Sequence, residues 1–254
     1  MAVEYNNLIK SIGYNQHSIL KDIMDMHNEG KPFDADITYS KGNFYGNFKR
    51  IRNDGTEEEF EIPRPKYTFD VSPQDEETVK LDPLGNIPLA DNSLDSIVCD
   101  LPFVIAPRNI KSKDGSNITI KRFSSYYPIG ECINSYNHWL KECYRVLKND
   151  GILIWKTQAT VTSGRQLMMP EWSWLYATSL GFDTLDQFFL LAKSRLHSGK
   201  IKTQQHARKF SSTFYVFKKT KKKIKYLDCM TEEERKLFID NADHIQTEEE
   251  TENK

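Results

Sequence analysis

Short apolar segments that each end at or near an aspartate most constrain the fold of this 254-residue chain. Four of them lie in its first hundred residues, and their acids are Asp36, Asp70, Asp82 and Asp100. Aspartate and proline both stop strands, so strand termination is one interpretation of the pattern. The other is a ligand site, because open α/β sheets bind ligands at the carboxyl ends of their strands. Because the pattern occurs four times, it favours the ligand site.

Helical and strand-like segments alternate along the rest of the chain. Apolar spacing predicts helices over 16–28, 131–151 and 171–182. Strands are predicted within 33–39, 65–73, 79–89, 96–100, 152–158, 184–193 and 211–219, and 50–64 is expected to be an exposed hairpin or excursion. The alternation predicts an α/β fold with a doubly wound, seven-stranded, mostly parallel sheet. The last two strands lack a helix between them, so one antiparallel strand is expected near the C-terminus.

Length, cysteine content and apolar runs restrict the class of protein. A chain of 254 residues suits one α/β domain better than two small ones. Its four cysteines show no Cys-x-x-Cys pairing, which argues against a disulfide framework or a zinc site and favours a reducing compartment. The start has no signal-like apolar region, and no apolar run is long enough to span a bilayer. We therefore expect a soluble, cytoplasmic protein with no metal and no membrane partner.

Charge is unevenly distributed, although the formal net charge is only −1. Residues 187–227 contain twelve Lys or Arg and no Asp or Glu, whereas 228–254 contain ten acids against three bases. A third segment, 105–128, has five basic residues against one acid and interleaves them with aromatic residues. Clustered basic residues favour a polyanionic partner, typically nucleic acid.

The stretch "CDLPFV" lies at the end of the fourth apolar segment, and a glycine loop, "DITYSKGNFY", follows the first. Together with "YRVLKNDGILIWKTQ" and "AKSRL…QQHARKFSSTFYVF", these features resemble the class I S-adenosylmethionine-dependent methyltransferases over about Asn15 to Lys219. Within that class the chain is similar to phage and bacterial DNA amino-methyltransferases, which carry an Asp/Asn-Pro-Pro-aromatic motif and act on adenine N6 or cytosine N4. The resemblance implies a Rossmann-like fold.

Catalytic roles follow from the resemblance at four positions. It implies that the side chain of Asp100 and the carbonyl of Leu101 accept the two hydrogens of an exocyclic amine, which aims its lone pair at the methyl group. Phe103, placed by Pro102, would stack on the base, and a base in duplex DNA would have to be flipped out. The chain departs from the family at Leu101, where proline is usual, but leucine also supplies the main-chain carbonyl.

S-adenosyl-L-methionine is the implied cofactor. Asp70 would bind the ribose hydroxyls, Asp36 the amino end of the donor and Asp82 the adenine amino group, while the turn after the first strand would approach the methionine half. The implied cofactor-binding residues are Asp36, Tyr39, Ser40, Gly42, Asp70, Val71 and Asp82.

Nucleic acid, with DNA favoured, is the implied macromolecular partner, and a homodimer or a partner subunit is left open. The expected organisation is a methyltransferase domain over 1–225 with the basic and aromatic insert at 105–128. An acidic tail at 226–254, disordered in part, would carry a short helix that begins with the capping pair Thr231 and Glu234. The candidate contacts to nucleic acid are Arg108, Lys111, Lys121, Arg122, Arg195, Arg208 and Lys209.

Three functions remain open on the sequence alone. The favoured one is methylation of adenine N6 in DNA; no Pro-Cys nucleophile motif is present, which argues against cytosine C5 chemistry. The second is an RNA amino-methyltransferase, forming N6-methyladenine or N2-methylguanine, because some RNA guanine-N2 enzymes carry a similar Asp-Leu-Pro-Phe. The third is a nucleic-acid-binding module of the same fold that has lost catalysis.

Overall fold

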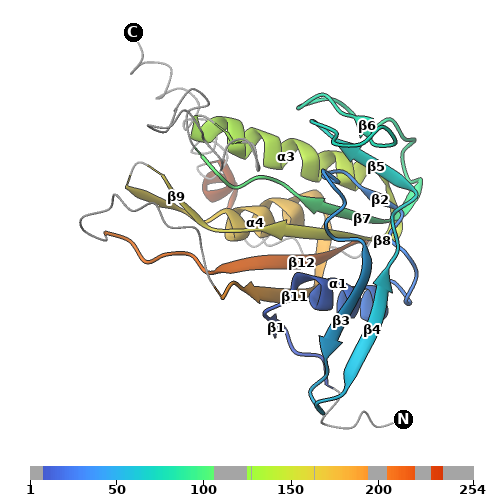
Figure 1. The fold of residues 1–254 in the computed structure, drawn as a ribbon. Coiled ribbons are helices and arrows are strands. Elements are labelled where there is room, and N and C mark those ends of the chain that lie inside the picture. Colours follow the sequence, from blue (N-terminus) through green and yellow to red (C-terminus); the bar gives the residue numbers. More distant parts are fainter. Residues whose placement is uncertain are drawn as a thin grey trace, which may run out of the picture.

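A single twisted sheet of eight strands organises the chain (Figure 1). The computed structural model describes residues 8–105, 125–126, 128–162, 164–193, 205–220 and 230–236. In order across the sheet, the strands are β1 (Ile12–Gly13), β11 (Phe182–Leu191), β12 (Ser211–Lys219), β8 (Leu147–Thr157), β7 (Leu94–Asp100), β2 (Ala35–Asp36), β5 (Tyr67–Asp70) and β6 (Val79–Lys80).

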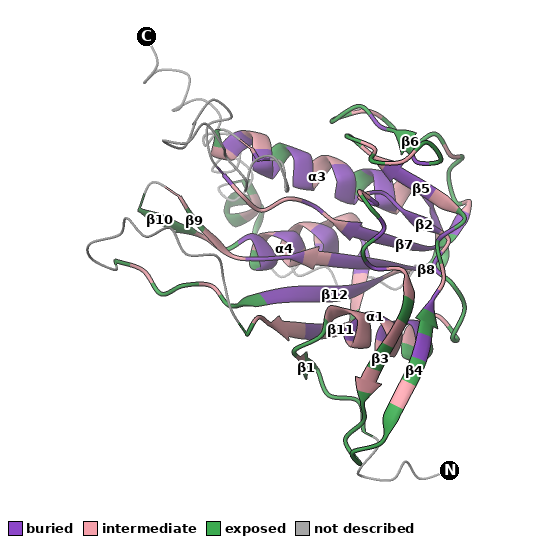
Figure 2. Cartoon of the chain, in the orientation of Figure 1, coloured by how far each residue is buried: buried purple, intermediate pink, exposed green. Residues whose placement is uncertain are grey.

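Helices cover both faces of this sheet, as its alternating side chains require. In β7, Cys99 packs in one core cluster with α3 (Ile129–Val146) and α4 (Met169–Leu180), whereas Val98 packs in a second cluster with α1 (Gln16–His27). Successive strand residues point to opposite faces, so the two clusters lie on opposite sides of the sheet. Figure 2 shows the buried residues concentrated in the central strands and on the sheet-facing sides of α3 and α4.

Strand directions confirm the predicted fold class. β12 pairs antiparallel with both β11 and β8, and the other pairings in the eight-stranded sheet are parallel. The sheet has one strand more than predicted, because the two-residue β1 adds to the edge of β11. The hairpin expected at 50–64 is also present, as β3 (Gly46–Ile51) paired with β4 (Glu57–Ile62).

The order of strands reverses between β2 and β7. From β2 the chain builds β5 and β6 on one side; it then returns to place β7 and β8 on the other side of β2. Such a reversal leaves a crevice outside the carboxyl ends of the two strands, because their following segments diverge to opposite sides. The carboxyl ends of β2 and β7 are Asp36 and Asp100.

Two predicted boundaries were wrong. α3 ends at Val146 rather than at 149–151, because Leu147 is already extended and pairs with Leu94 as the first residue of β8. The third apolar segment forms only the two-residue β6, and Asp82 lies in the loop beyond it. The capping pair Thr231 and Glu234 forms its two reciprocal hydrogen bonds, but the helix it begins is described only over 232–236.

Most of the 105–128 insert and most of the acidic tail lie outside the described residues. Within the described ranges, no helix is both long and apolar enough to cross a membrane.

Candidate active site

Three of the strand-end acids meet at one edge of the sheet. β2 pairs in parallel with both β5 and β7, so the carboxyl ends of all three strands face the same way. Asp36 ends β2, Asp70 ends β5 and Asp100 ends β7. This edge contains the crevice between β2 and β7.

Two of these acids also terminate their strands. An oxygen of Asp36, Oδ1, accepts hydrogen bonds from the Thr38 N–H at 2.7 Å and the Thr38 hydroxyl at 3.1 Å. Similarly, Oδ1 of Asp70 accepts the Ser72 N–H at 2.7 Å. In both cases the aspartate caps the turn that follows it. Strand termination does not exclude a ligand site, because the turn uses only Oδ1 of each aspartate and leaves Oδ2 outside the turn.

The loop after β2 ties the three strand ends together. Thr38 Oγ1 accepts the N–H of Asp100 at 2.7 Å, which links this loop to β7. On the other side, the Ser40 N–H donates to Oδ2 of Asp70 at 2.8 Å, and the Tyr39 N–H donates to the carbonyl of Phe69 at 2.9 Å. The only sequence signal for the role of Thr38 was a polar residue two positions after an aspartate.

Asp36 is enclosed by the protein and is only 1% exposed. Its Oδ2 accepts the hydroxyl of Tyr45 at 2.7 Å. Burial raises the pKa of Asp36 to about 7, against hydrogen bonds from Tyr45 and Thr38 that lower it, and the charge of Asp100 adds to the rise. Burial likewise raises the pKa of Tyr45 far above its ordinary value. Asp36 thus titrates near neutral pH.

Gly42 makes the tight turn of this loop. Its φ is +66°, its N–H donates to the Tyr39 carbonyl at 2.7 Å, and the Tyr39 ring lies directly against it. That ring is itself held between Tyr45, at 5.5 Å between centroids, and the guanidinium of Arg64, at 4.8 Å from its centroid. A side chain at position 42 has neither the backbone conformation nor the space it needs.

Gly42→Ala should therefore destabilise the protein by about 2–4 kcal/mol, from left-handed backbone strain and a steric clash together. An added Cβ would clash with the hydroxyl end of the Tyr39 ring. Gly55→Ala is the matched control, because Gly55 has a φ of +84° but nothing within 4 Å of an added Cβ. Urea denaturation should show a clearly smaller loss for Gly55→Ala. Equal losses would mean that the ring moves aside freely.

The Asp-Leu-Pro-Phe segment leaves β7 with its leucine in the core. Leu101 is 5% exposed and belongs to the cluster on the α3 and α4 side. The Pro102 carbonyl accepts the hydroxyl of Tyr136, from α3, at 3.2 Å. Phe103 is half-buried. Position 101 is therefore held by the packing of its leucine side chain, whereas the motif that it resembles usually has a rigid proline there.

Lys156, which was not predicted to be a site residue, lies beside Asp100. The two residues are register partners on β8 and β7, and Lys156 Nζ lies 2.6 Å from Oδ2 of Asp100. Their side chains are 13% and 23% exposed. The available signal was a lysine directly after the apolar run "ILIW", because a strand buried on both faces rarely holds an unpaired charge.

The remaining candidate residues are placed less centrally. Val71 and Asp82 are exposed in the loops after β5 and β6, at the same edge as Asp70. Lys209 reaches the hairpin of β9 (Thr160–Thr162) and β10 (Arg165–Leu167), where its Nζ donates to Gln166 at 2.7 Å, and Arg208 beside it is exposed. Five candidate contacts to nucleic acid lie outside the described residues: Arg108, Lys111, Lys121, Arg122 and Arg195.

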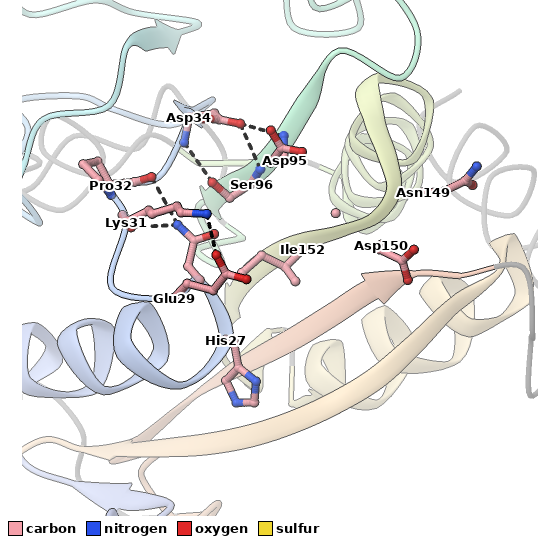
Figure 3. Close-up of a pocket in the computed structure, with 12 residues that line it drawn as sticks. His27, Glu29, Lys31, Pro32, Asp34, Asp95, Ser96, Asn149, Asp150 and Ile152 are labelled. Carbon is pink, nitrogen blue, oxygen red and sulfur yellow. Dashed lines mark hydrogen bonds and ion pairs between the residues drawn. The ribbon is translucent and has the colours of Figure 1, made fainter.

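A polar hollow of about 270 Å³ lies at the opposite, amino-terminal edge of β7 (Figure 3). Several of its polar groups make contacts within the fold: the Asp34 carboxylate accepts the N–H groups of Asp95 at 2.6 Å and of Ser96 at 3.2 Å. Lys31 pairs there with Glu29. None of the candidate site residues lines this hollow, so it is separate from the edge that holds the three acids.

No protein-family model and no curated protein matches this chain. Solved structures similar to it include a proposed DNA modification methylase from Thermus thermophilus complexed with S-adenosyl-L-methionine (15% identity, TM-score 0.32, 59% of this chain and 53% of that one). The cytosine-N4-specific PvuII DNA methyltransferase is also similar (16% identity, TM-score 0.35, 52% of this chain and 45% of that one). A proposed sarcosine dimethylglycine methyltransferase from Galdieria sulphuraria shares 15% identity with this chain (TM-score 0.43, 80% of this chain and 85% of that one). The matched part spans about half the length of the first two proteins.

Proposed function

We propose that the chain is an S-adenosylmethionine-dependent methyltransferase that acts on an exocyclic amino group of a nucleobase, with adenine N6 in DNA as the favoured target. One observation carries the proposal. Asp36, Asp70 and Asp100 end neighbouring parallel strands at the strand-order reversal, and one loop joins all three. Ligands of doubly wound sheets bind at this place.

The donor side of the proposed site is formed by β2, β5 and the loop between them. Each oxygen of Asp70 accepts one main-chain N–H, from Ser40 or Ser72, and keeps a second lone pair for a ribose hydroxyl. Asp36 is only 1% exposed and its oxygens accept from Thr38 and Tyr45, so, once ionised, it would attract the ammonium end of the donor through its charge rather than by direct contact. When bound, S-adenosylmethionine supplies a sulfonium-activated methyl group: the acceptor nitrogen gains the methyl, the C–S bond breaks to leave a neutral thioether, and one proton of the amine passes to solvent.

Asp70→Ala should weaken binding of S-adenosylmethionine at least about tenfold, because charged and bidentate hydrogen bonds contribute more than about 1.4 kcal/mol. Isothermal titration calorimetry measures this directly. Asp54→Ala is the matched control, since Asp54 makes the same kind of turn with Thr56 but lies on the β3–β4 hairpin. Donor affinity that survives Asp70→Ala would remove Asp70 from the proposed site.

The acceptor side is formed by the segment after β7. No residue in the described ranges donates a hydrogen bond to Oδ1 of Asp100, so this oxygen is available to an amine hydrogen. The Leu101 carbonyl would accept the second hydrogen, and the half-buried Phe103 would stack on the base. An amine held by both acceptors has its lone pair directed away from the ring.

Two basic segments, the 105–128 insert and the segment that contains Lys209, each contact the β9–β10 hairpin near this acceptor side. Ile105, where the insert begins, accepts a hydrogen bond from Thr162 of β9 through its carbonyl at 3.5 Å. Lys209 of the second basic segment contacts β10 of the same hairpin through Gln166. Both segments would therefore contact the backbone of a nucleic acid whose base enters the proposed site. The proposed catalytic domain covers 1–225.

Mass spectrometry of nucleosides tests the proposal, using DNA and RNA incubated with the protein and isotope-labelled donor. Labelled N6-methyldeoxyadenosine, from DNA alone, is the expected product. A labelled product from RNA alone would move the same chemistry to RNA. Tight nucleic-acid binding without donor binding or any labelled product would overturn the proposal and support a nucleic-acid-binding module.

A further inference from the structure

The ion pair between Asp100 and Lys156 holds the carboxylate of the proposed acceptor site at one oxygen. It follows from strand register, because the two residues lie directly opposite each other on parallel neighbours. Nζ of Lys156 approaches Oδ2 at 2.6 Å, and no described residue donates to Oδ1. The two oxygens of one carboxylate are therefore in different environments.

The lysine also contacts two aromatic rings. Its Nζ lies 5.1 Å from the ring centroid of Phe44, in the loop after β2, and 5.6 Å from that of Phe214, in β12. Cations lie favourably over aromatic faces at these distances. The main chain of Asp100 is held too, by its N–H bond to Thr38. The carboxylate is thus restrained through its backbone and through one oxygen.

We propose that Lys156 is a positioning residue for the transfer: it occupies Oδ2 of Asp100 and so presents Oδ1 to the target amine. The inference rests on the proposed function. An ionised carboxylate has about four acceptor positions, so binding one lysine leaves Oδ1 fully able to accept an amine hydrogen. Without the lysine, the carboxylate rotates about its Cβ–Cγ bond, and the acceptor has to be oriented again in each turnover.

The lysine also balances charge in the crevice. Asp36 on β2 lies close enough for the charge of Asp100 to raise its pKa. Lys156 is the cation that pairs with Asp100 among the described residues. It thereby keeps two neighbouring acids compatible in a partly buried place, since like charges there repel strongly.

Three single variants test the role, with labelled S-adenosylmethionine and DNA as substrates. Lys156→Met keeps the length of the side chain but removes its charge, and should lower kcat about 10- to 100-fold with donor Kd changed less than about threefold. Lys156→Arg keeps the positive charge and should retain most of the kcat of the unaltered protein. Lys148→Met is the matched control: Lys148 is on the same strand and pairs with Asp95 of β7 at 2.7 Å, but at the opposite edge. It should leave kcat unchanged.

A double-mutant cycle with Asp100→Asn separates positioning from general stability. If Lys156 acts through Asp100, Lys156→Met should cause no further loss of kcat in the Asp100→Asn background and should restore part of it, because the amide can then turn its oxygen toward the amine. Additive losses, or full kcat in Lys156→Met, would overturn the positioning role while methyl transfer by the unaltered protein still upholds the proposed function. Absence of transfer by the unaltered protein would reject both.

Discussion

Asp100→Asn should lower kcat for methyl transfer about 100- to 1,000-fold and leave the affinity for S-adenosylmethionine nearly unchanged. Losing one preorganised group that acts on the reacting atoms typically costs this much. The substitution is nearly isosteric, but Lys156 dictates its effect. The lysine at Oδ2 requires an acceptor, so the amide oxygen of the new side chain turns toward it. The amide NH₂ then faces the target amine and repels its hydrogens.

Initial rates with labelled donor measure the loss, and calorimetry measures donor binding. Asp95→Asn is the matched control, because Asp95 lies on the same strand and also pairs with a β8 lysine, Lys148. It is far from the carboxyl edge and should not change kcat. Turnover retained in Asp100→Asn would remove Asp100 from the acceptor site. Loss of donor affinity instead of kcat would place it on the donor side.

The sequence predicted the position of the acids because the end of a strand is a local property and strand direction follows from the connections along the chain. Apolar runs that end at Asp36, Asp70 and Asp100 have to share an edge once their strands are parallel. The alternation of strands and helices likewise predicted the covered, mostly parallel sheet and its antiparallel strand β12. These features depend on residue periodicity and on chain order.

The sequence did not predict which residues contact these acids. Lys156 meets Asp100 only because β7 and β8 pair in one particular register, with an irregularity between Leu94 and Ser96 that shifts it. A register is set by packing across the whole sheet rather than by either strand. Pairing across the sheet also decides where β8 begins: Leu147 pairs with Leu94, although the turn-forming residues 149–151 follow it. The burial of Asp36 is also a property of the assembled layers.

That burial should make the protein less stable as pH rises, and Asp36→Asn should remove the effect. The pKa of Asp36 is about 7 in the folded protein and near 4 in an unfolded chain. Between these values the folded state holds a proton that the unfolded state has released, so the free energy of unfolding falls as pH increases. The contribution is fully present below about pH 4 and is lost above about pH 7, and its size is at most about 4 kcal/mol.

Asp36→Asn cannot ionise, and its amide can still accept from Thr38 and contact Tyr45. Its stability relative to the unaltered protein should therefore grow by up to about 4 kcal/mol between about pH 4 and pH 8, as measured by urea denaturation at several pH values. Donor binding should weaken at the same time if the charge of Asp36 attracts the ammonium group. The exposed Asp54 has a lowered pKa, chiefly from its hydrogen bond with the Thr56 hydroxyl, so Asp54→Asn should gain no stability as pH rises. Stability curves for Asp36→Asn that parallel those of the unaltered protein would show that Asp36 is ionised in the fold. Its placement as a buried, neutral acid would then be wrong.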